Sequence, residues 1–136
     1  MTQRASIAET HRGPQLVNAL RAAATLAVLA ILWQGATAGG ILMQTRTFLG
    51  LHEAGAIAVH VLTGVVALLA FLTGRSTRGL LWPAVLGAVV FVASFVQAAL
   101  GDDETMWAHV PGALLLMLGS AVVLVWAWLP SRSAFR

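Results

Sequence analysis

Four long apolar runs, separated by short polar stretches, make up most of the chain. They cover residues 22–43, 49–73, 79–101 and 106–129. A helix needs about 20 residues to cross a hydrocarbon layer of about 30 Å, and Glu53 is the one acidic or basic residue within the runs. The pattern predicts an all-α fold, an integral membrane four-helix bundle with up-down-up-down order. We expect residues 1–136 to form a single transmembrane domain, with residues 1–21 as a cytoplasmic tail.

The composition supports a membrane protein and indicates its orientation. Of the 136 residues, 59% are hydrophobic and 10% are charged, whereas soluble domains carry about 25% charged residues. All basic residues are arginines, and only Arg46 lies in a loop that follows an odd-numbered span. The positive-inside rule therefore puts both termini in the cytoplasm, and we expect a multi-pass protein of the inner (cytoplasmic) membrane. The first run resembles the apolar core of a signal peptide, but we interpret it as a retained helix.

Two classes of function are excluded at this level. The chain has no basic face that could follow a nucleic-acid duplex, so we expect no nucleic-acid partner. It has no cysteine, which excludes disulfides, thiolate metal sites and covalent haem attachment.

The second and fourth runs match each other at an offset of 57 residues without a gap. His52 falls on His109 and Gly55 on Gly112. The first and third runs agree more weakly, with Gln34 opposite Gln97 at an offset of 63. The chain therefore consists of two tandem helix hairpins, related by an approximate two-fold axis along the membrane normal.

This repeat makes the histidines a candidate metal site. His52 and His109 each lie three residues into their spans, so they are expected at one depth near the outer face, on diagonally opposed helices. Two facing imidazoles suit the axial positions of a haem iron. Gly55 and Gly112, one turn deeper, would leave room for a porphyrin or for close helix packing. Arg46 could pair with haem propionates, with Glu53 or with lipid phosphate.

Less specific interpretations stay open. His52 and His109 could instead be interfacial histidines bonded to water, a backbone carbonyl or a glutamine. A site that adds Glu53 to the two histidines is a further alternative. His60 is expected to be a buried histidine bonded to Thr63 or to a neighbouring helix, with an axial pairing of His60 and Met117 as the second interpretation.

The quoted residues resemble two groups of proteins. Leu51-His52 and Gly55, with the segment Trp107-Ala-His-Val-Pro-Gly112, resemble a family of small, uncharacterised four-helix bacterial membrane proteins. The histidines on the second and fourth helices are similar to one half of haem A synthase, a tandem of four-helix haem-binding units. This second resemblance implies a haem-binding bundle and does not imply the synthase reaction.

We therefore expect a b-type haem protein of the lipid bilayer that transfers electrons or handles haem, with quinone or another membrane redox partner as the exchange partner. No catalytic set is evident, so an enzyme is not expected. The alternative is a cofactor-free accessory or assembly subunit of a larger membrane complex, or a homo-oligomer. A small transporter or channel is a third interpretation.

Overall fold

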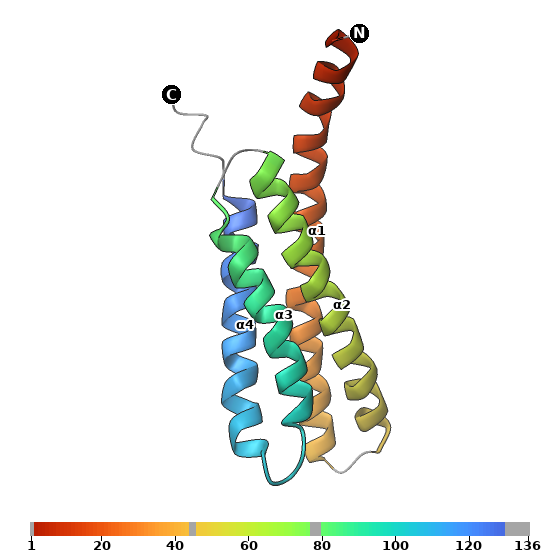
Figure 1. The fold of residues 1–136 in the computed structure, drawn as a ribbon. Helices are drawn as coiled ribbons and strands as arrows, with labels where there is room; N and C mark the ends of the chain where they lie inside the picture. Colours follow the sequence, from red (N-terminus) through yellow and green to blue (C-terminus); the bar gives the residue numbers. More distant parts are fainter. Residues whose placement is uncertain (1, 44–45, 77–79, 130–136) are drawn as a thin grey trace.

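Four helices account for nearly all of the structure described. The computed structural model describes the backbone of residues 2–43, 46–76 and 80–129, and within them the side chains from Pro14 onward. In chain order the helices are α1 (Thr2–Leu42), α2 (Arg46–Ser76), α3 (Trp82–Ala99) and α4 (Met106–Trp128). They lie side by side along most of their lengths (Figure 1). The predicted all-α, four-helix architecture is confirmed.

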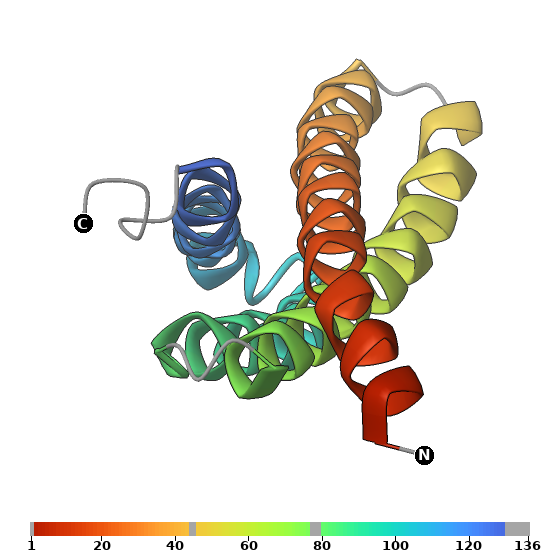
Figure 2. The same cartoon turned by 90° about the horizontal axis from the view of Figure 1, so that it is seen from above.

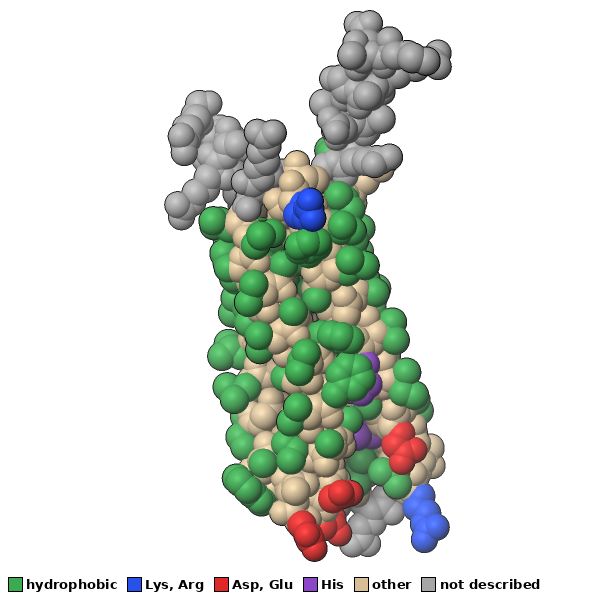
Figure 3. Space-filling model, viewed as in Figure 1, with side chains coloured by type: hydrophobic (Ala, Val, Ile, Leu, Met, Phe, Trp, Pro, Cys, Tyr) green, Lys and Arg blue, Asp and Glu red, His purple; other side chains and the backbone are tan. Residues whose placement is uncertain are grey.

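Each helix contains a segment that is long and apolar enough to cross a membrane. The segments are Pro14–Leu42, Arg46–Ser76, Trp82–Ala99 and Met106–Trp128. Apolar side chains cover much of the face drawn in Figure 3. Large apolar side chains are exposed on all four helices, among them Leu68 at 57% and Leu115 at 70% exposure. Such a surface is costly in water but ordinary against lipid tails. The chain is therefore a multi-pass membrane protein.

The first helix extends beyond the predicted span of 22–43. It begins at Thr2, so the segment expected as a tail is helical. Leu20 is only 1% exposed and belongs to the main core cluster with Ala23 and Ala24. The apolar periodicity of the span continues one turn further toward the N-terminus than the uninterrupted apolar run indicates.

The helices pack in a ring, α1 against α2, α2 against α3, α3 against α4, and α4 against α1. This order places α2 diagonally opposite α4. Viewed along the bundle, the helices cross at an angle to one another rather than running strictly parallel (Figure 2). The core has two parts, one around Leu20, Val66 and Val123, the other around Val59 and Leu116.

The repeat predicted from the sequence is visible in the pattern of burial. At the offset of 57, buried positions of α2 coincide with buried positions of α4: Val59 with Leu116, Thr63 with Ser120, Val66 with Val123 and Ala70 with Ala127. At the offset of 63, buried positions of α1 coincide with those of α3: Leu20 with Pro83, Ala24 with Gly87, Ala27 with Val90 and Ile31 with Ser94. The two hairpins therefore bury equivalent faces, although few of these residue pairs are identical.

Candidate functional site

His52 and His109 lie together between the diagonal helices. Their ring centroids are 6.4 Å apart, and the ring planes are inclined by 52°. His52 lies in the second turn of α2 and His109 in the first turn of α4, and both side chains are half-buried. The prediction that the repeat brings these two rings together is confirmed.

A backbone carbonyl of α3 orients the ring of His109. The Nδ1 atom lies 2.9 Å from the carbonyl oxygen of Gln97. A carbonyl oxygen only accepts hydrogen bonds, so Nδ1 carries the proton and donates it. The side chain of Gln97 returns a second bond, from its Nε2 to the carbonyl oxygen of His109 at 2.7 Å. This pair of bonds joins α3 to α4 and leaves Nε2 of His109 with its lone pair.

Residues of α1 orient the ring of His52 in the same sense. Its Nδ1 lies 3.0 Å from the hydroxyl oxygen of Thr37. The hydroxyl of Thr37 donates to the carbonyl oxygens of Trp33 and Gln34, at 3.0 and 3.1 Å. Because that proton is used, the oxygen of Thr37 accepts from Nδ1 of His52. The Nε2 atom of His52 therefore also keeps its lone pair.

The two glycines make room for the two glutamines. An alanine Cβ at Gly112 would lie 2.5 Å from Oε1 of Gln97, and one at Gly55 would meet Oε1 of Gln34 even more closely. In the structure each glutamine side chain takes up the space beside its glycine. The same three residue types, histidine, glycine and glutamine, thus meet in both halves of the repeat. Of the two amides, Gln97 is bonded across the helices as described, whereas Oε1 of Gln34 is buried and has no hydrogen-bonding partner within the described part of the chain.

The charged candidates, Arg46 and Glu53, lie at the same end of the bundle as the two histidines, but outside the cluster that the histidines form. Arg46, the first residue of α2, is exposed. Glu53 is exposed as well, and no group of three or more histidine, aspartate or glutamate side chains that could hold a metal forms among the described residues. The described structure therefore does not bring Glu53 into one group with the two histidines. The physical reason is helix geometry, because consecutive residues point about 100° apart around the axis.

His60 has the environment expected of a histidine bonded to a neighbouring helix. Its Nδ1 lies 2.8 Å from Oγ of Ser94 on α3, and its ring stacks on Phe95. The other expected partner, Thr63, instead donates to the carbonyl oxygens of Val59 and His60. Met117, the repeat counterpart of His60, packs against the core cluster that contains Ile31.

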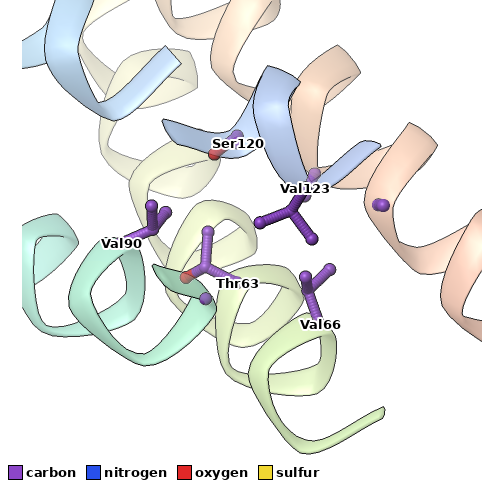
Figure 4. A pocket seen from close by; sticks show the side chains of 8 residues that line it. Thr63, Val66, Val90, Ser120 and Val123 are labelled. Carbon is purple, nitrogen blue, oxygen red and sulfur yellow. The ribbon is translucent and has the colours of Figure 1, made fainter. Parts of the chain in front are cut away.

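A small cavity lies on the axis of the repeat (Figure 4). Its volume of about 10 Å³ is at the lower limit for one water molecule. The lining consists of four pairs of repeat counterparts: Ala24 and Gly87, Ala27 and Val90, Thr63 and Ser120, Val66 and Val123. The cavity is far too small for a macrocycle, so it is distinct from any haem site at the histidines.

The sequence reasoning missed Thr37 and the pairing of each glutamine with a glycine. The glutamines had a signal, since they match at the offset of 63 and a glutamine was among the partners expected for the histidines. Thr37 had none, because the repeat puts Leu100 at its position. No protein-family model, curated protein or solved structure matches this chain.

Proposed function

We propose that the protein binds one b-type haem in the membrane, with His52 and His109 as the two axial ligands of the iron. The observation that carries the proposal is the shared orientation of the two imidazoles. In both rings Nδ1 donates to a partner on a neighbouring helix, which leaves Nε2 with a free lone pair. Histidines that bind metals are oriented in this way, with the second ring nitrogen donating to a carbonyl or another acceptor.

The separation of the rings agrees with a shared iron atom. If both Nε2 atoms pointed at one iron, two metal–nitrogen bonds of about 2 Å each, with about 1 Å from each nitrogen to its ring centre, would put the centroids about 6 Å apart. The observed distance is 6.4 Å. A porphyrin supplies four ligands of its own, so two histidines complete the coordination. This donor set therefore suits a haem better than a closed zinc site, which needs four protein ligands.

The residues around the pair have distinct expected roles. Gln97 holds the ring of His109, and Thr37 holds the ring of His52, in each case through the Nδ1 atom of the histidine. Gln34 lies beside Gly55 as Gln97 lies beside Gly112. A bound porphyrin would have to share the space next to the glycines with these flexible amides. Arg46, exposed near the start of α2, is the candidate partner for a propionate.

The proposed orientation is an up-down-up-down bundle with both termini in the cytoplasm of a bacterial cell and the histidine pair near the outer face of the cytoplasmic membrane. The asymmetry of the arginines supports it. A haem in this position supplies one-electron exchange. Electron transfer or haem handling is the function we propose, with a lipid-soluble quinone or a membrane redox protein as exchange partner.

Titration of haem into the haem-free protein in detergent tests the proposal. We expect saturation at one haem per chain, and loss of tight binding in His52→Ala and in His109→Ala. The matched control is His60→Met, which removes an imidazole elsewhere in α2 and should bind haem normally. Binding that survives in both alanine variants would place the haem elsewhere and overturn the assignment.

One observation favours a second candidate, a subunit without a cofactor that associates with other membrane helices. Gly35 and Gly39 lie one turn apart on an exposed part of α1, and an added Cβ at either would meet nothing within 4 Å. Small residues at this spacing allow close approach of another helix. If this candidate is correct, Gly35→Leu and Gly39→Leu reduce the assembly mass measured in detergent, while the haem titration shows no saturable binding.

A further inference from the structure

His60 occupies the middle of α2 and presents its ring to α3. It is 14 residues from Arg46 and 16 from Ser76, so it lies near the centre of the bilayer if the helix spans it. Nδ1 is 2.8 Å from Oγ of Ser94. The ring also stacks on that of Phe95, with centroids 4.3 Å apart and planes inclined by only 6°.

The contacts of Ser94 indicate which nitrogen of His60 carries the proton. Oγ of Ser94 lies 2.6 Å from the carbonyl oxygen of Phe91, which can only accept a hydrogen bond. A hydroxyl has one proton, so both contacts of Oγ are hydrogen bonds at once only when Nδ1 of His60 donates, and this leaves Nε2 as an acceptor. Nε2 has no hydrogen-bonding partner among the described residues, and it is not fully buried. It therefore reaches the surface of the bundle, and Figure 3 shows histidine side chains on that surface between apolar ones.

The fold does not need this polar pair. The repeat counterparts of His60 and Ser94 are Met117 and Ile31, which pack together in one apolar cluster. The second half of the molecule thus fills the same position with two apolar side chains. An acceptor without a donor is costly at membrane depth, and polar side chains inside a membrane generally mark a functional position.

An aromatic surface adjoins the free nitrogen. Phe95 is 50% exposed, and its ring meets that of Phe91 edge to face at 5.1 Å. Phe91 can lie close to α2 because Gly64 has no side chain, since a Cβ there would be 3.0 Å from the ring. The surface therefore combines one hydrogen-bond acceptor with exposed aromatic carbon, and it faces lipid.

We propose that His60 and Phe95 bind the head group of a lipid-soluble hydroquinone, whose hydroxyl donates a hydrogen bond to Nε2 of His60. A molecule that reaches this position must dissolve in the bilayer, carry a donor and present an aromatic face, and a hydroquinone meets all three requirements. The oxidised quinone has carbonyl oxygens in place of the hydroxyls, so it cannot satisfy an acceptor. The site therefore selects the reduced form.

This inference rests on the proposed function only in the choice of a redox-active ligand. His60 lies eight residues from His52, about 12 Å along α2, so a hydroquinone bound here would lie near the proposed haem. The binding itself needs no haem and can be measured without it.

The test uses haem-free protein, labelled with ¹⁵N-histidine, in phosphatidylcholine nanodiscs. A naphthohydroquinone with a short alkyl tail is added under reducing conditions, and the matching naphthoquinone is added in a parallel sample. We expect saturable binding of the reduced form with a shift of the His60 Nε2 resonance, and at least tenfold weaker binding of the oxidised form. Because haem is absent from this experiment, a failure to bind hydroquinone has no bearing on the haem titration. In the same way, a failure of the haem titration leaves the hydroquinone result valid.

The decisive variant places the counterpart residues of the second half at this position, as His60→Met combined with Ser94→Ile. This variant should fold, which its thermal unfolding checks, and should lose the preference for the reduced form. Equal binding of the two redox forms would overturn the proposal, as would unchanged binding in the double variant. Equal binding of a long-chain aliphatic alcohol would also overturn the proposal, because it would assign the acceptor to another lipid. A Nε2 shift that follows concentration-dependent dimerisation would overturn it as well, because it would assign the acceptor to a second copy of the chain.

Discussion

Replacing Gly112 by alanine tests the contact that ties α3 to α4 beside His109. The new Cβ would lie 2.5 Å from Oε1 and 3.0 Å from Cδ of Gln97, so the amide has to move. Gln97 is only 9% exposed, and its Nε2 donates to the carbonyl oxygen of His109 at 2.7 Å. The substitution therefore breaks this bond and leaves a buried amide without its partner.

The expected magnitude follows from two opposing effects. A buried polar group left without its hydrogen bond costs about 1–3 kcal/mol. Alanine in place of glycine favours a helix by about 1 kcal/mol. Gly112→Ala should therefore lower the free energy of unfolding by about 1 kcal/mol. In a Gln97→Ala background the clash and the bond are both absent, so the same substitution should stabilise the protein by about 1 kcal/mol.

Equilibrium unfolding of the four proteins in mixed detergent micelles measures this cycle. We expect a coupling of about 2 kcal/mol between the two positions, in the range found for residues in contact. The control is Gly35→Ala, because a Cβ at Gly35 meets nothing within 4 Å and only the helix preference should remain. The reasoning is refuted if Gly112→Ala is as stabilising as Gly35→Ala, or if the coupling is zero.

Two further predictions concern the opposite end of the bundle and the orientation in the membrane. Arg21 donates from Nε to the carbonyl oxygen of Ala127 at 2.9 Å, so Arg21→Gln should lower the free energy of unfolding by about 1–3 kcal/mol. The control is Arg75→Gln, at an exposed position without a described bond to a carbonyl. This control should change the free energy of unfolding by less than about 0.5 kcal/mol. An equal loss in both variants would contradict this. The chain has no native cysteine, so the variants Asp103→Cys and Ser76→Cys each carry a single thiol. A membrane-impermeant maleimide should label Asp103→Cys in intact cells and Ser76→Cys only after the membrane is opened. The reverse result would invert the proposed topology.

The sequence sufficed for the parts of the structure that depend on length, hydropathy and repetition. Apolar runs of about 20 residues determine the four helices. The offset of 57 brought His52 onto His109, and the structure places the two rings together. A repeat predicts such a contact because equivalent positions on diagonal helices meet at the axis.

Contacts between adjacent helices were less accessible to sequence reasoning. Whether Thr37 contacts His52 depends on how α1 rotates against α2, and hydropathy does not determine that rotation. The same holds for Ser94 beside His60, where the repeat gives no signal because the counterparts are apolar. The start of the bundle was missed because Arg21 interrupts the apolar run, although Leu20 on its far side is fully buried.

The electron paramagnetic resonance spectrum of the haem-loaded ferric protein tests the central claim most directly. Two axial imidazoles give a strong ligand field, so the account predicts a low-spin spectrum in the native protein and loss of that low-spin signal when haem is added to His109→Ala or to His52→Ala. A high-spin spectrum in the native protein, or a low-spin spectrum that persists unchanged in both variants, would contradict ligation by this histidine pair.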